Sequence, residues 1–174
     1  MKIEFIREIE APKDVVWKVI TDFSAYSEWN PFVTACAAEL TVGAPIVMTV
    51  RLGDRVRDQM EFVSEVVAGE RFEYRMKPVG PLLFSYRQHD IAAIGEARTR
   101  YRSTFVFQGL ISPLVGLALG AALRDGFQGM TESLVSRAEI LVASCHGFQG
   151  KGDGYLYLFG DFVVFFATFH SFLG

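Results

Sequence analysis

The residues best suited to chemistry recur at every second position in the stretch 83–94. Ser85, Arg87 and His89 share this spacing with the apolar Ile91, and in a strand such residues lie on one face. We therefore expect all four side chains to point into the protein. A buried arginine needs an acidic partner, which the protein or a ligand can supply. Histidine titrates near neutrality, so His89 is suited to act as a general acid or base.

Asp58 is the predicted acidic partner for this arginine. The apolar residues Val56, Met60 and Phe62 share its spacing, so Asp58 should face inward together with them. Two interpretations of an Arg87–Asp58 pair stay open: a structural ion pair without a catalytic role, or a pair that contacts a ligand. A shift of one residue in register would instead place Arg87 in solvent.

The stretch 97–108 adds hydrogen-bonding groups to the same inward face. Tyr101 and Ser103 alternate there with arginines, and their hydroxyl groups could donate hydrogen bonds to a ligand rich in carbonyl groups. We take Arg87, His89 and Tyr101 as the candidate catalytic residues. For His89, the alternative is a hydrogen-bonded histidine without catalytic function.

Other catalytic and metal-binding arrangements do not fit the sequence. Asp90 should point away from His89 on a strand, which argues against a Ser-His-Asp triad. The three histidines lack the spacing of metal ligands. The glycine-rich run 150–154 lacks the pattern of a phosphate-binding loop. We therefore expect neither a metal nor a cofactor.

Composition and charge indicate a compact globular protein. Of the 174 residues, 51% are hydrophobic and 21% are charged, which excludes a disordered chain. The net charge of -3 and the absence of a Lys/Arg cluster argue against a nucleic-acid partner. Cys36 and Cys145 form no CxxC pair and suit reduced thiols. Glu4 and Arg7 interrupt any apolar N-terminal run, so we expect no signal peptide and a cytoplasmic location.

The chain opens with a predicted strand and two short helices. Residues 3–9 alternate between apolar and polar, which is typical of a strand. Pro12 suits the first position of a helix over 12–21, and a second helix is expected over 24–29. Because Pro31 disfavours a helical conformation at the residue before it, the chain should become extended there.

Six further strands and one long helix complete the predicted domain. Turn-like residues such as Val42-Gly43 separate the strands, so we expect short hairpins and an antiparallel sheet. An apolar stripe from Gly116 to Leu141 predicts a helix over 113–143. The small residues in its first half should leave a cavity between helix and sheet. The predicted strands span 32–40, 45–52, 55–66, 70–77, 83–94 and 97–108.

Five short motifs carry a resemblance to a known superfamily. They are WKVITDFSAYSEWNPF (17–32), GPLLF (80–84), TRY (99–101), FQG (107–109) and GFQGM (126–130). Together they resemble the START-like ligand-binding superfamily, also called SRPBCC or Bet v 1-like. They are most similar to its polyketide cyclase/dehydrase-like branch, and the resemblance covers residues 3–143.

The resemblance implies an α+β helix-grip fold, in which a curved antiparallel sheet wraps around a long C-terminal helix. Members bind lipids, polyketides or other hydrophobic molecules in an internal cavity, and some are cyclases or aromatases. We thus expect residues 1–145 to bind a hydrophobic small molecule, with a cyclase or aromatase as the alternative. The aromatic run 23–32 should close one rim of the cavity. The expected ligand-binding residues are Trp29, Phe32, Asp58, Met60, Phe62, Tyr74, Ser85, Arg87, His89, Tyr101, Ser103, Gly120, Leu123 and Phe127.

The remaining residues, 146–174, depart from the family pattern. A glycine-rich linker leads into 155–173, nineteen residues in which Asp161 is the only formal charge. Asp161, Gly160 and His170 disfavour a membrane-spanning helix. Three interpretations stay open: a segment packed on its own domain or on a partner protein, a segment that touches a membrane, or a non-native sequence. The second would make the protein a membrane-associated lipid-handling module.

Overall fold

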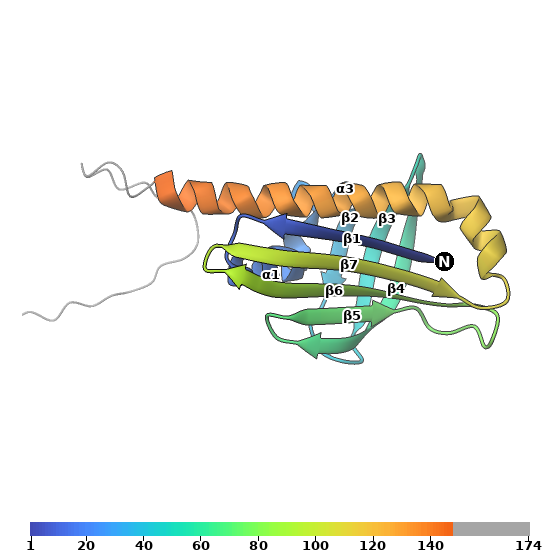
Figure 1. Ribbon diagram of the computed structural model, residues 1–174. Coiled ribbons are helices and arrows are strands. Elements are labelled where there is room, and N and C mark those ends of the chain that lie inside the picture. The colour runs from blue at the N-terminus through green and yellow to red at the C-terminus, as the bar shows by residue number, and fades with distance from the viewer. Residues whose placement is uncertain (148–174) are drawn as a thin grey trace, which may run out of the picture.

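The computed structural model describes residues 1–147, with side chains up to Ser144. This part of the chain forms one antiparallel sheet of seven strands, three α-helices and a short 3-10 helix, η1 (Figure 1). The bounds are β1 (Lys2–Ile9), α1 (Lys13–Thr21), η1 (Phe23–Ala25), α2 (Tyr26–Trp29), β2 (Val33–Ala38), β3 (Pro45–Leu52), β4 (Arg55–Val67), β5 (Arg71–Arg75), β6 (Phe84–Gly95), β7 (Arg98–Gln108) and α3 (Ser112–Gly147). The α+β helix-grip fold predicted from the sequence is confirmed.

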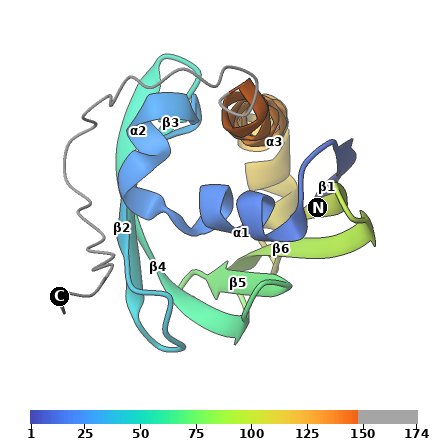
Figure 2. The same cartoon turned by 90° about the vertical axis from the view of Figure 1, so that its left-hand side faces the viewer.

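Hairpins join the strands from β2 to β7, as the turn-like residues predict. The order across the sheet is β1-β7-β6-β5-β4-β3-β2, so β1 lies beside the last strand and β2 forms the opposite edge. In the β1–β7 pair, Ile3 lies opposite Phe105 and Ile9 opposite Thr99. All neighbouring strands are antiparallel, and the sheet is curled around one helix (Figure 2).

That helix, α3, lies along the concave face of the sheet (Figures 1 and 2). Phe127, Met130 and Leu134 recur at intervals of three or four residues on its buried face, as in an amphipathic helix. The first turns differ, because Leu114 is 71% exposed and Leu117 is 88% exposed. The second half of α3 therefore fills the core, and its first half leaves space against the sheet.

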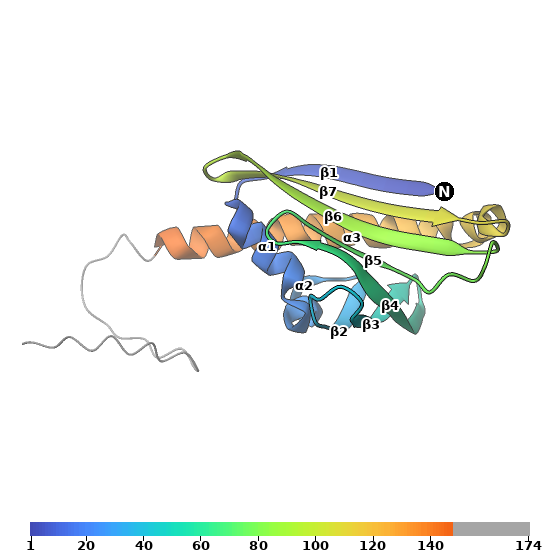
Figure 3. The same cartoon turned by 90° about the horizontal axis from the view of Figure 1, so that it is seen from below.

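The aromatic run after β1 forms η1 and α2, which with α1 close the end of the sheet near the C-terminal half of α3 (Figure 3). Tyr26 is buried and donates a 2.6 Å hydrogen bond from its hydroxyl to the carbonyl of Ile20. The side-chain oxygen of Asn30 accepts hydrogen bonds from the backbone N–H groups of Phe32, at 3.0 Å, and Val33, at 2.9 Å. This local turn leads the chain from α2 into β2.

The inward face of β4 is the opposite of the predicted one. Val56 and Met60 are 56% and 58% exposed, whereas Glu61 and Val63 are buried. Apolar residues occupy both faces of this strand, so the alternation of residue types did not define one register. The polar side chains of Arg57, Gln59 and Glu61 consequently lie on the inward face of β4.

The predicted Arg87–Asp58 ion pair is wrong for the same reason. Asp58 is exposed and accepts a 2.8 Å hydrogen bond from the hydroxyl group of Thr49 on β3. Arg87, on β6, is buried as predicted. Any carboxyl group that interacts with Arg87 must therefore belong to another residue.

The predictions for the linker and for residues 155–173 lie outside the described residues. A contact of this segment with a membrane or a partner protein stays a prediction. Within residues 1–147, the structure contains no helix that is both long and apolar enough to cross a lipid bilayer.

Candidate functional site

A cavity of about 450 Å³ lies between the first half of α3 and the inner face of the sheet. Val115, Leu119, Leu123 and Phe127 of α3 form one wall, and apolar side chains of β2, β3 and β7 form much of the opposite wall. Small-molecule sites in proteins typically have volumes of roughly 300–1,000 Å³ and mostly apolar walls. The size and lining of this cavity suit a small hydrophobic ligand.

Charged and polar side chains from β4, β6 and the loop after β5 also line the cavity. Glu61, Ser85 and Arg87 are buried, with exposed fractions of 4%, 3% and 1%. Arg57 and Lys77 line it as well and are exposed to solvent. The lining thus combines two exposed cationic side chains, Arg57 and Lys77, with two buried ionisable side chains, Glu61 and Arg87.

Arg87 is the most deeply buried charge in this lining. Its guanidinium carbon lies 3.9 Å from the centre of the Phe127 ring, a cation–π contact. Its Nη2 lies 3.8 Å from the sulfur of Met130, a weak acceptor. Among the described residues, its Nε and Nη1 have no hydrogen-bond partner, and none of the salt bridges involves it.

Glu61 is the carboxyl group that the structure places in this cavity. Its Oε1 accepts a hydrogen bond from the side-chain amide of Gln59, whereas its Oε2 has no partner among the described residues. Burial raises the pKa of Glu61 to about 7, although the hydrogen bond from Gln59 and the charge of Arg87 oppose that rise. Glu61 therefore exchanges a proton close to neutral pH.

Glu61 was not predicted from the sequence, because the alternation of residue types assigned the opposite face of β4 to the interior. The signal was present, since Arg57, Gln59 and Glu61 recur at every second position. A polar series of this kind normally indicates the solvent face of a half-buried strand. Here it lines a cavity, where polar groups orient a ligand.

His89 and Tyr101 lie on the inward face, as predicted, but do not line the cavity. His89 Nδ1 lies 2.7 Å from the Tyr101 hydroxyl oxygen, and the His89 ring stacks on Phe72 with centroids 4.6 Å apart. Burial, and to a lesser extent Arg87, lowers the pKa of His89 well below its usual 6.5. Burial raises the pKa of Tyr101 to about 12. The pair is therefore uncharged at neutral pH, and its predicted catalytic role stays a prediction.

The structure brings half of the predicted ligand-binding residues to the cavity. Those that line it are Phe32, Met60, Tyr74, Ser85, Arg87, Leu123 and Phe127, of which Met60 is largely exposed to solvent. Those that do not are Trp29, Asp58, Phe62, His89, Tyr101, Ser103 and Gly120. Within the described residues, no group of three or more His, Cys, Asp or Glu side chains could hold a metal ion.

Gly120 and Trp29 have other surroundings. A Cβ atom at Gly120 would lie 3.3 Å from the sulfur of Met1, so this small residue makes room for the N-terminus of the chain. Trp29 packs edge-on against Tyr26, with ring centroids 5.0 Å apart. Both residues therefore contribute to packing next to the cavity.

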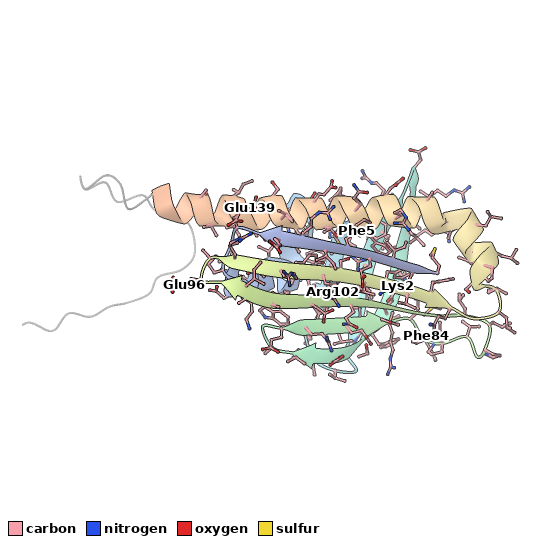
Figure 4. All side chains as sticks on the ribbon, viewed as in Figure 1. Lys2, Phe5, Phe84, Glu96, Arg102 and Glu139 are labelled. Atoms are coloured by element: carbon pink, nitrogen blue, oxygen red, sulfur yellow. The ribbon has the colours of Figure 1, made fainter. Side chains whose placement is uncertain are left out.

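A second hollow, of about 420 Å³, lies over β5, β6 and β7. Arg71 Nε donates a 2.6 Å hydrogen bond to Asp90 there, and its Nη1 lies 3.6 Å from a carboxyl oxygen of Glu65. Figure 4 shows the side chains of these strands, with Arg102 labelled on β7. Because Arg71 is already paired with carboxylates, we regard this hollow as a solvated ion-pair surface.

Comparison with known proteins gives a family match and a set of similar structures. Residues 1–139 match the family described as polyketide cyclase / dehydrase and lipid transport. No curated protein matches the chain.

The similar structures include an enzyme and a START superfamily protein. Zhui aromatase/cyclase from Streptomyces sp. R1128 has a TM-score of 0.68 and 18% identity, over 82% of this chain and 95% of that chain. A START superfamily protein from Mycobacterium smegmatis has a TM-score of 0.62 and 16% identity, over 80% and 98%. A protein from Thermobifida fusca has a TM-score of 0.62 and 24% identity, over 80% and 94%. At these identities the likeness shows the fold alone.

Proposed function

Since the chain belongs to the polyketide cyclase / dehydrase and lipid transport family, we propose that it binds a hydrophobic small molecule in the cavity between the sheet and α3. The observation that carries this proposal is the position of Arg87. Its side chain lines an otherwise mostly apolar cavity while two of its nitrogen atoms have no partner among the described residues.

Packing and electrostatics both support this proposal. The walls of the cavity of about 450 Å³ are mostly apolar, and apolar surface left in contact with water costs free energy. The buried charge of Arg87, which has no salt bridge among the described residues, adds several kcal/mol of desolvation cost. A bound molecule that fills the cavity and hydrogen-bonds to Arg87 offsets both costs.

The first test of this function is to fill the cavity with a larger side chain. Leu123→Trp places an indole ring where α3 lines the cavity. We expect it to weaken binding of the neutral fluorescent probe N-phenyl-1-naphthylamine by at least about tenfold, equivalent to about 1.4 kcal/mol. Native and denatured masses of the purified protein, measured in parallel, report any ligand that the protein carries.

Ile140→Trp is the matched control for this substitution. Ile140 lies on the same helix, is 56% exposed and does not line the cavity. It should leave probe binding unchanged. Equal binding by wild type and Leu123→Trp would show that the probe binds elsewhere, and the proposed site would then be abandoned.

A second candidate function is a cyclase or aromatase that uses the same cavity, and Glu61 favours it. A carboxyl group with a pKa near 7 is suited to general acid–base catalysis. In such a reaction the Glu61 carboxylate removes a proton from the carbon between two carbonyl groups, and Arg87 stabilises the enolate oxygen. The enolate carbon then bonds to another carbonyl of the same chain, and the resulting alkoxide recovers the proton from Glu61.

Turnover of a linear poly-β-ketone distinguishes this candidate from simple binding. If the protein is a cyclase, Glu61→Gln should lower the rate of product formation by about 100-fold or more while probe binding is retained. Arg87→Met should abolish turnover, and His89→Asn tests the catalytic role predicted for His89. No consumption of the ketone by the wild-type protein would eliminate the cyclase hypothesis for this substrate class and leave the binding function.

A further inference from the structure

We propose that the ligand of this cavity is an amphipathic organic acid, whose carboxylate lies beside Arg87 and Glu61 and whose apolar body packs against α3. This inference rests on the proposed binding function and adds the chemical class of the ligand. It follows from the charges that line the cavity and from the polar atoms that have no partner there.

The lining of the cavity is cationic, although the whole chain is acidic. Its charged residues are Arg57, Lys77, Arg87 and Glu61, whereas the whole chain has a net charge of -3. A concave site with an excess of one sign of charge concentrates the opposite ion. An anionic ligand is therefore attracted into this cavity, in contrast to the average surface of the protein.

Arg87 supplies the deepest binding group for an anionic oxygen. The Phe127 ring holds one side of its guanidinium group, the Met130 sulfur lies beside Nη2, and the Tyr101 hydroxyl is close enough to interact with the guanidinium. Nε and Nη1 remain as donors without partners. Hydrogen bonds from a guanidinium to a carboxylate are among the strongest in proteins, because both groups are charged. A carboxylate head group satisfies these donors and neutralises the buried charge.

Glu61 makes this binding depend on pH. Its protonated form can donate a hydrogen bond from Oε2, which has no partner among the described residues, whereas its ionised form repels a carboxylate. The titratable groups that share the lining with Glu61 are Arg87 of β6, Tyr74 of β5, Arg57 of β4 and Lys77 of the following loop. The lining residues of β2, β3, β7 and α3 are uncharged. Binding of a carboxylate should therefore be accompanied by proton uptake at Glu61.

Acid and methyl ester pairs that share one apolar body test this inference. The probes are dodecanoic acid with methyl dodecanoate, and anthracene-2-carboxylic acid with its methyl ester, measured by isothermal titration calorimetry with the full-length protein. At about pH 6, where the acids are ionised and Glu61 is mostly protonated, we expect at least one acid to bind about tenfold or more tightly than its ester. Titrations at about pH 7.5 in buffers of different ionisation enthalpy should report proton uptake on binding.

Variants of Arg87 and Glu61 test whether these residues cause the preference for the acid over the ester. Arg87→Met should remove the preference for the acid, and Arg87→Lys, which keeps the charge, should retain part of it. Glu61→Gln should remove the weakening of acid binding between about pH 6 and pH 8. Arg51→Met is the control for general charge, because Arg51 is exposed on β3 and does not line the cavity. It should leave the preference unchanged.

The outcomes separate this inference from the proposed function. If the esters bind as tightly as the acids, the inference is overturned and the binding function stands. If the acids are preferred but no proton is taken up, the role of Glu61 is overturned. If none of the four probes binds and the protein carries no ligand, the proposed function fails and the inference falls with it.

Discussion

Glu61 is a residue whose protonation should be measurable in the stability of the protein. Burial raises its pKa to about 7 from an ordinary value of 4.5. At a pH between these two pKa values, the Glu61 carboxyl is mostly protonated in the folded protein and mostly ionised in the unfolded chain. The stabilisation from the protonated carboxyl is therefore fully present below about pH 4.5 and is lost as the pH rises through about 7.

Glu61→Gln should remove this pH dependence. Between about pH 4.5 and pH 8, the free energy of unfolding of the wild type should fall by up to about 3 kcal/mol relative to the variant, since one pKa unit corresponds to about 1.4 kcal/mol. Urea denaturation of both proteins at several pH values measures the difference. If the two free energies of unfolding differ by the same amount at every pH in this range, Glu61 does not titrate as described.

A second buried titratable group makes the comparison with a variant necessary. His89 has a lowered pKa because of its burial, so its contribution has the opposite sign and is lost as the pH falls below about 6.5. The difference between wild type and Glu61→Gln cancels this contribution. Glu96→Gln, in the exposed turn between β6 and β7 (Figure 4), is a control that should leave the pH dependence of stability unchanged.

At the scale of elements, the contact between the start of β2 and α3 determines one end of the cavity. The Phe32 ring lies directly over Gly126, where a Cβ atom would come within 2.1 Å of a ring carbon. The same ring packs edge-on against Phe127, with centroids 4.8 Å apart. Since both phenylalanines line the cavity, the glycine in the helix allows the two elements to approach closely enough to form this wall.

Gly126→Ala should therefore destabilise the protein. We expect a loss of roughly 1–3 kcal/mol in the free energy of unfolding, as for other overpacked positions, although alanine favours the helix. Gly129→Ala is the matched control one turn later, where the added Cβ would lie 3.4 Å from Pro31. It should stabilise the protein by up to about 1 kcal/mol through helix propensity. Urea or thermal denaturation measures both, and a stabilised Gly126→Ala would contradict this description of the contact.

The sequence allowed most of the elements to be predicted, because their signals are local. Alternating residues and turn-like separators identified the hairpins, and the stripe of α3 identified the long helix. Arg87 was placed correctly because it shares a strand face with Ile91. Glu61 was missed because the apolar residues on both faces of β4 left its orientation undetermined. A cavity depends on which side chains meet across the sheet, and no single strand carries that information.

At the scale of the whole molecule, the pairing of β1 with β7 has no local signal in the sequence. The N-terminal amino group of Met1 donates a 2.8 Å hydrogen bond to the carbonyl of Phe107, across 106 positions of sequence. β1 thereby completes the sheet next to its last strand, and α3 covers both. The sheet and the helix form one unit whose first and last elements depend on each other.

This arrangement has a consequence for synthesis on the ribosome. The first strand is translated before the rest of the sheet, but its partner leaves the exit tunnel only after about a hundred further residues, and the helix that covers the sheet follows later still. Until then the nascent chain exposes apolar strand faces that have nothing to pack against, a state prone to aggregation. Completion of the fold must therefore follow translation of nearly the whole domain. Because the decisive contacts are distant in sequence, folding should take milliseconds to seconds, as is typical of topologies rich in long-range strand pairing.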